Sequence, residues 1–156
     1  MIQEDASRIL ELHRQIKALE TKMAAVAADS QLTVLLTTIP GFGPICTAEL
    51  SGEIGNCSRF AKESSLALYV GMAALDHSSE QYQGIKAPRQ INRRAKAAMM
   101  VAVDRHRKQV PASQRHYEKK RAEGKGHNQA VRALGRNLCR TIFKMFKENC
   151  PYKIRN

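Results

Sequence analysis

A glycine- and proline-rich turn constrains this chain more than any other feature. Residues 39–44 read Ile-Pro-Gly-Phe-Gly-Pro and separate two short apolar segments of helical character. Gly41 and Gly43 can adopt positive φ without steric cost and leave the backbone accessible, while Pro44 suits the first turn of a helix. Unpaired amides at such a helix start favour a bound phosphate. The sequence therefore predicts a helix-hairpin-helix over 32–54, with a plain turn between two helices as the alternative.

The first 28 residues carry a heptad pattern. Apolar residues recur every seven positions from Ile2 to Met23, and a second series runs from Leu12 to Val26. Alternating spacings of three and four are typical of a coiled-coil seam. We predict a helix over 2–28 that associates with a second copy of the chain or pairs with a neighbouring helix. A single amphipathic helix docked on its own chain is the alternative.

The rest of the chain also has helical patterns. Further helices are expected over 64–72, 92–107, 114–122 and 128–149. The face of the second that carries Ala95, Ala98, Met99 and Ala102 is expected to pack inward, and Pro111 is expected to break this helix. Between the first two of these, Ser78 to about Pro88 is polar and contains turn residues, so we expect a loop there. Because no strand pattern competes, we predict an all-α fold with a coiled-coil linker helix at 1–30 and a helical domain at 31–150.

Positive charge is concentrated in the second half of the chain. The formal net charge is +12, but residues 79–156 hold 20 Lys and Arg against five Asp and Glu, whereas residues 1–78 carry −3. This asymmetry is typical of a nucleic-acid partner, with a solvated basic face as the alternative. A membrane-surface helix needs bulky apolar residues opposite its charges, and no apolar run approaches the roughly 18 residues of a membrane span. We expect no membrane partner and, without a signal-peptide pattern, a cytoplasmic location.

The cysteine and histidine spacings do not favour a metal site. The four cysteines lie at 46, 57, 139 and 150, and the five histidines are equally scattered. Zinc sites use closer ligand pairs. We therefore expect reduced thiols and no metal or other cofactor in this chain.

Several motifs follow one another in a defined order along the chain. After the turn come Arg59-Phe60, Leu68-Tyr69-Val70-Gly71-Met72, Ser78-Ser79, Asn92-Arg93-Arg94 and His116-Tyr117-Glu118-Lys119-Lys120-Arg121-Ala122-Glu123-Gly124-Lys125. This series resembles the carboxy-terminal half of transposases of the insertion sequence 110, 116 and 902 family. In that family a coiled coil joins a RuvC-like nuclease domain to a helical domain, and a structured RNA guides DNA recombination in characterised members.

The resemblance implies a catalytic serine. Family members use a serine of the helical domain as the proposed nucleophile, and counting from Gly71 places it at Ser79, where it would form a covalent link to DNA. Glu80 stands where the family has glycine. The RuvC-like domain, with its metal-binding carboxylates, is not part of these 156 residues. The chain alone is therefore expected to be inactive, and Mg²⁺ is expected only together with that domain.

The residues predicted to contact DNA belong to the turn, to the helix start after it and to the basic segments, since arginine suits bidentate phosphate contact. They are Gly41, Gly43, Ile45, Lys86, Arg89, Arg93, Arg94, Lys119, Lys120 and Arg121. We predict the DNA-binding domain of an insertion-sequence transposase, acting in serine-mediated strand exchange when joined to its nuclease domain. Its expected partners are DNA, a structured guide RNA and a second copy through residues 2–28, in a bacterial cytoplasm at the nucleoid. The alternative is a stand-alone helix-hairpin-helix module that binds DNA or RNA without catalysis.

Overall fold

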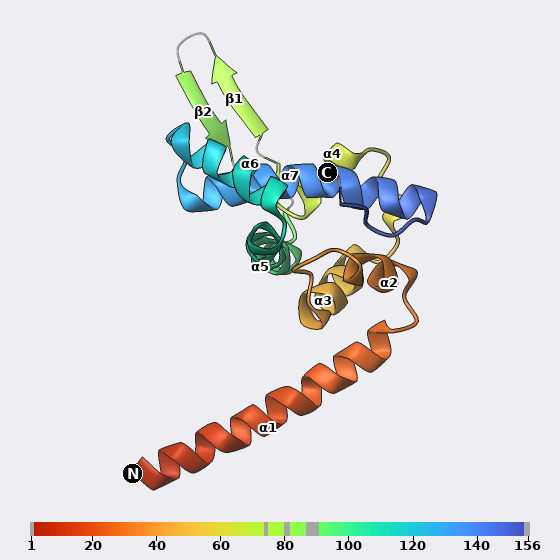
Figure 1. The fold of residues 1–156 in the computed structure, drawn as a ribbon, viewed down its shortest axis with the longest axis vertical. Helices are drawn as coiled ribbons and strands as arrows, with labels where there is room; N and C mark the ends of the chain where they lie inside the picture. The colour runs from red at the N-terminus through yellow and green to blue at the C-terminus, as the bar shows by residue number, and fades with distance from the viewer. Residues whose placement is uncertain (1, 74, 80–81, 87–90, 155–156) are drawn as a thin grey trace.

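The computed structural model describes residues 2–73, 75–79, 82–86 and 91–154 (Figure 1). Its elements are α1 (Ile2–Ala27), α2 (Gln31–Thr37), α3 (Pro44–Ile54), a 3-10 turn (Cys57–Arg59), α4 (Glu63–Tyr69), β1 (Leu75–Ser79), β2 (Tyr82–Lys86), α5 (Arg93–Gln109), α6 (Pro111–Ala122) and α7 (His127–Glu148). The predicted helical fold class is confirmed. None of the described helices is both long and apolar enough to cross a membrane.

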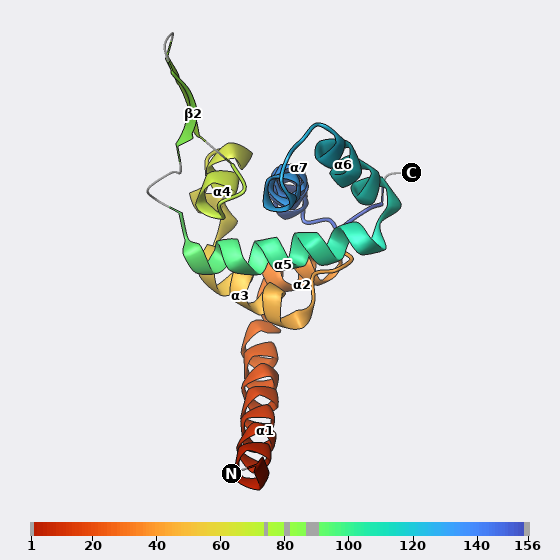
Figure 2. The same cartoon turned by 90° about the vertical axis from the view of Figure 1, so that its left-hand side faces the viewer.

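The expected loop between 78 and 88 is corrected by the structure. β1 and β2 pair antiparallel, with Leu75 opposite Lys86 and Ser79 opposite Tyr82. The hairpin extends away from the helices in both views (Figures 1 and 2). Sequence periodicity missed it because this polar segment lacks the alternation that marks a half-buried strand. Its strands are joined by the backbone ladder instead.

Helix α5 lies at the centre of the helical body. It packs against α3 on one side and against α6 and α7 on the other (Figure 2). Ala95, Ala98, Met99 and Ala102 are buried, as the pattern of this helix predicted. Alanines on this face let the neighbouring helices approach closely, and the cap at Asn92, whose side chain accepts hydrogen bonds from two amides of the first turn, fixes where α5 begins.

Helix α1 stands apart from this core. None of its 26 residues is buried, and its main contacts are with α3 (Figure 1). The side chains at the heptad positions are exposed, from Met23 at 37% to Val26 at 85%. The structure therefore does not support the alternative that this helix docks along its own chain. Self-association stays a prediction.

Candidate nucleic-acid interface

The turn between α2 and α3 is tightly hydrogen-bonded within itself. Gly41 adopts φ +86°, the amide of Phe42 donates to the Ile39 carbonyl over 3.1 Å, and the amide of Gly43 donates to the Gly41 carbonyl over 3.2 Å. Helix α3 then begins at Pro44. Two of the amides expected to face a phosphate are thus used by the turn, which leaves those at the start of α3, around Ile45, for an external ligand.

The space over Gly41 is occupied by the protein itself. A Cβ atom at this position would lie 2.4 Å from the backbone nitrogen of His106 in α5. The open backbone at Gly41, expected to admit another molecule, therefore admits α5 instead. A ligand can approach this turn from the side of Gly43 and the start of α3.

Arg105 of α5 lies on that accessible side. Its Nη1 atom is 3.6 Å from the point where a Cβ of Gly43 would stand. The side chain is exposed and has no ion pair with a carboxylate among the described residues. Burial raises the pKa of the neighbouring Cys46 thiol, and the Arg105 guanidinium opposes that rise, which places its charge at the first turn of α3. Sequence reasoning missed Arg105, because nothing in the local pattern distinguishes it from other arginines of this helix.

His106 fixes the turn from inside. Its ring is fully buried, with Nδ1 2.7 Å from the Pro40 carbonyl oxygen and Nε2 3.0 Å from the Ser113 hydroxyl oxygen. Since a carbonyl can only accept, Nδ1 carries the proton and Nε2 accepts from Ser113. Burial lowers the pKa of His106, although its hydrogen bond to Pro40 opposes this. The neutral ring thereby joins the turn to α5 and α6.

The arginines at the amino end of α5 differ in their surroundings. Arg93 is exposed and forms no ion pair with a described carboxylate. Arg94 contacts two carboxylates of α3, Glu53 at 3.2 Å and Glu49 at 3.6 Å. Of this predicted pair, Arg93 has the charge available for a phosphate.

The predicted basic run in α6 is likewise only partly available. Lys119 is exposed without a described carboxylate partner. Lys120 pairs with Glu123 at 2.9 Å, and Arg121 donates to the Lys125 carbonyl over 2.8 Å. Lys119 is therefore the free cation of this run.

The predicted interface residues do not form one cluster. Gly43, Ile45 and Arg105 meet at the turn, but Arg93 lies twelve positions earlier on α5, about 18 Å along the axis. Figure 2 places the β-hairpin at that amino end and α6 at the opposite end of α5. The unpaired cations among these described residues thus lie near the two ends of α5 and on α6.

The candidate nucleophile lies outside this arrangement. Ser79 is the last residue of β1, at the outer end of the hairpin, whereas Lys86 pairs with Leu75 at its base. Four strand positions separate the two ends, about 13 Å. Arg89 lies outside the described residues. Within the part of the chain that is described, no three His, Cys, Asp or Glu side chains gather as metal ligands.

Comparison with known proteins places this geometry in context. The family model described as Transposase IS116/IS110/IS902 family matches residues 34–118, which include the turn, the hairpin, α5 and most of α6. The insertion element IS110 uncharacterized 43.6 kDa protein of Streptomyces coelicolor is 34% identical over 151 residues, covering 96% of this chain and 37% of that protein. The insertion element IS900 uncharacterized 42 kDa protein of Mycobacterium paratuberculosis is 30% identical, covering 94% and 39%. The pilin gene-inverting protein of Moraxella bovis is 28% identical, covering 76% and 38%. The chain thus spans less than two fifths of the length of each of these relatives.

Proposed function

The chain belongs to the IS116/IS110/IS902 transposase family, and we propose on this basis that it is the DNA-binding carboxy-terminal part of an insertion-element transposase. The observation that carries the proposal is a set of exposed or half-exposed cations that have no ion pair with a carboxylate in the described ranges. They include Arg93, Arg105, Arg115, Lys119 and Arg132. Charges left unpaired by the fold are available to phosphates.

The turn offers the best-defined phosphate position. The Arg105 guanidinium stands beside Gly43, and the first-turn amides of α3 and the helix dipole favour an anion at the same place. These contacts go to the DNA backbone and carry no direct sequence information. Sequence choice in this proposal comes from a structured guide RNA or from another part of the protein.

Ser79 is proposed to act when a nuclease domain is joined to this part. The serine hydroxyl oxygen would bond to phosphorus while a base takes its proton. The bond from phosphorus to the sugar oxygen would break, and that oxygen would leave as a free hydroxyl after taking up a proton. Mg²⁺ held by the nuclease domain would stabilise the developing charge. The position of Ser79 at the outer end of a hairpin that extends from the helical body supports this proposal (Figure 1).

Duplex DNA binding should weaken steeply with salt. We expect the logarithm of the association constant to fall with the logarithm of salt concentration at a slope of about −3 to −4, as for about four neutralised phosphates. Arg105→Ala should weaken binding about tenfold and make the slope less steep by about 1. Arg8→Ala, on exposed α1, is the matched control. Fluorescence anisotropy across a salt series measures both quantities, and a flat slope would refute the proposal.

A further variant and a competition measurement extend this experiment. Ser79→Ala keeps the net charge and should leave duplex binding unchanged, while abolishing the covalent protein–DNA adduct in a protein that also carries the nuclease domain. An adduct that persists would remove Ser79 from the mechanism. If structured RNA of equal length displaces duplex DNA completely while duplex DNA does not displace the RNA, the chain is an RNA-binding module instead.

The apolar stripe of α1 is proposed to bind a second copy of this chain. Light scattering should give at least twice the monomer mass, and Leu12→Asp should return the mass to that of a monomer because the seam then buries a carboxylate. Leu10→Asp is the matched control, since Leu10 is 71% exposed on the same helix but lies off the heptad positions. Equal masses for the two variants would contradict the coiled-coil pairing.

A further inference from the structure

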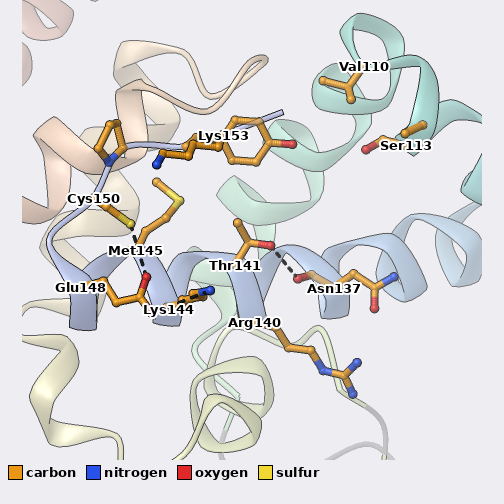
Figure 3. A pocket seen from close by; sticks show the side chains of 13 residues that line it. Val110, Ser113, Asn137, Arg140, Thr141, Lys144, Met145, Glu148, Cys150 and Lys153 are labelled. Carbon is orange, nitrogen blue, oxygen red and sulfur yellow. Dashed lines mark hydrogen bonds and ion pairs between the residues drawn. The ribbon is translucent and has the colours of Figure 1, made fainter. Parts of the chain in front are cut away.

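An open cavity of about 610 Å³ lies between the start of α6, the carboxyl half of α7 and the carboxy-terminal tail (Figure 3). Its volume is within the range of small-ligand sites. None of the residues predicted from the sequence to contact DNA lines it. It is therefore separate from the interface at the turn.

The tail that closes one side of the cavity is held in place by α2 and α5. The amide of Tyr152 donates to the Thr38 hydroxyl over 2.9 Å. The Tyr152 ring stands edge-on to the buried ring of His106, with 5.7 Å between ring centroids. These contacts draw the tail toward the turn and keep it from collapsing onto α7, so the cavity belongs to the fold.

The lining combines three kinds of chemistry. Apolar surface comes from Val110 and Met145, and an aromatic ring from Tyr152. Neutral hydrogen-bonding groups come from α7, where Asn137 and Thr141 line the cavity and the Thr141 hydroxyl donates to the Asn137 backbone carbonyl oxygen over 3.4 Å (Figure 3). This half-apolar, half-polar surface suits a planar heterocycle better than a purely ionic ligand.

Positive charge lies at the rim. Lys153 forms no ion pair with a carboxylate among the described residues, and Lys144 contacts Glu148 only at 3.7 Å. Arg140 also borders the cavity, but its side chain points away from it in Figure 3 and pairs with Glu63 of α4. The two lysines are therefore the cations available to an anionic ligand here.

We propose that this cavity binds one unpaired nucleotide of a single-stranded nucleic acid, with its base against Tyr152 and its phosphates between Lys144 and Lys153. Aromatic and apolar walls stack bases of any sequence, and amide and hydroxyl groups such as Asn137 bond to exposed base edges. A base within an intact duplex cannot enter, because it is stacked and paired. The inference rests on the proposed function in assuming a nucleic-acid partner, but it concerns a different site and a different form of the strand.

The test compares single-stranded and duplex binding in the same 156-residue protein. Anisotropy is measured at low salt with a short DNA strand, an RNA strand of equivalent sequence, and a DNA duplex. Ala112→Trp fills the cavity from an exposed lining position of α6 and should weaken single-strand binding about tenfold, within the range expected for loss of one stacked base. The double variant Lys144→Gln, Lys153→Gln should weaken it by a similar factor. Duplex binding should be unchanged in both proteins.

A matched control and separate arms keep the result interpretable. Lys147→Gln alters an exposed lysine of the same helix outside the cavity and should leave single-strand binding unchanged. Loss confined to the RNA arm or to the DNA arm supports the site and identifies the strand that it takes. Unchanged single-strand affinity in Ala112→Trp and in the double lysine variant overturns the inference. If the unaltered protein does not bind duplex DNA, the proposed function is overturned. The single-strand measurements would still show whether the cavity binds a nucleotide.

Discussion

Replacing Gly41 with alanine should lower the free energy of unfolding by about 3–5 kcal/mol. Alanine disfavours the positive φ of this residue, and the added methyl group would overlap neighbouring atoms. The residue has φ +86°, and the added methyl group would stand 2.4 Å from the backbone nitrogen of His106. Backbone cannot rotate away as a side chain can, so either the turn or α5 must shift. Because small domains are stable by about 5–15 kcal/mol, the loss should be large in urea denaturation followed by circular dichroism.

Two other glycines separate the causes of this loss. Gly55 also has positive φ, at +62°, but no atom lies within 4 Å of its added Cβ. At φ +62° and ψ −112° Gly55 lies outside the left-handed helical region, so Gly55→Ala should cost about 1–3 kcal/mol, the conformational part alone. Gly52 lies inside α3 with open space around it. Gly52→Ala should therefore raise the free energy of unfolding by about 0.5–1 kcal/mol. If Gly41→Ala is no worse than Gly55→Ala, α5 does not pack on the turn as described.

Replacing His106 with leucine should cost about 2–4 kcal/mol, since it leaves the Pro40 carbonyl and the Ser113 hydroxyl without their buried partner. It should also change the pH dependence of stability. Burial lowers the pKa of His106 in the folded protein, whereas the unfolded chain takes up the proton near pH 6.5. Below that pH the unfolded state binds more protons, so the stability of the unaltered protein falls as pH falls.

The measurement is the free energy of unfolding at pH 7.5 and at pH 5.5. His106 should contribute to the loss of stability between these pH values, and His106→Leu should lack that contribution. His116, whose pKa is also lowered by burial, acts in the same direction and should still do so in the variant. His13→Leu on exposed α1 should change stability at pH 7.5 by less than about 0.5 kcal/mol. An identical pH dependence in the His106 variant would contradict the neutral buried ring.

Local sequence patterns predicted the elements that local chemistry determines. The turn residues and Pro44 placed α2 and α3, and the Ala-Met face of α5 was correctly assigned to the core. Pro111 is predicted to end the helix before it, and α6 in fact begins at that residue, because proline also favours the first helical position. The predominantly helical class followed from the same periodicity, but the paired strands β1 and β2 did not.

Contacts between distant segments could not be predicted in this way. His106 bonds to Pro40 across 66 residues of sequence, and Arg105 reaches Gly43 through the same packing of α5 on the turn. The sequence correctly identified Gly41 as special, but not that the protein's own helix would occupy the space that it leaves open. The pairing of Arg94 with two α3 carboxylates could not be predicted either, because its partners are more than 40 positions away in the sequence.

The length of the exposed 26-residue helix α1 determines how far its amino end moves when its orientation changes. At 1.5 Å per residue it measures about 39 Å, comparable with the diameter of a small domain. It acts as a lever arm: each bend of about 10° where it meets α3 carries its far end through about 7 Å. Small angular differences at that joint would therefore become large displacements of whatever the amino end holds.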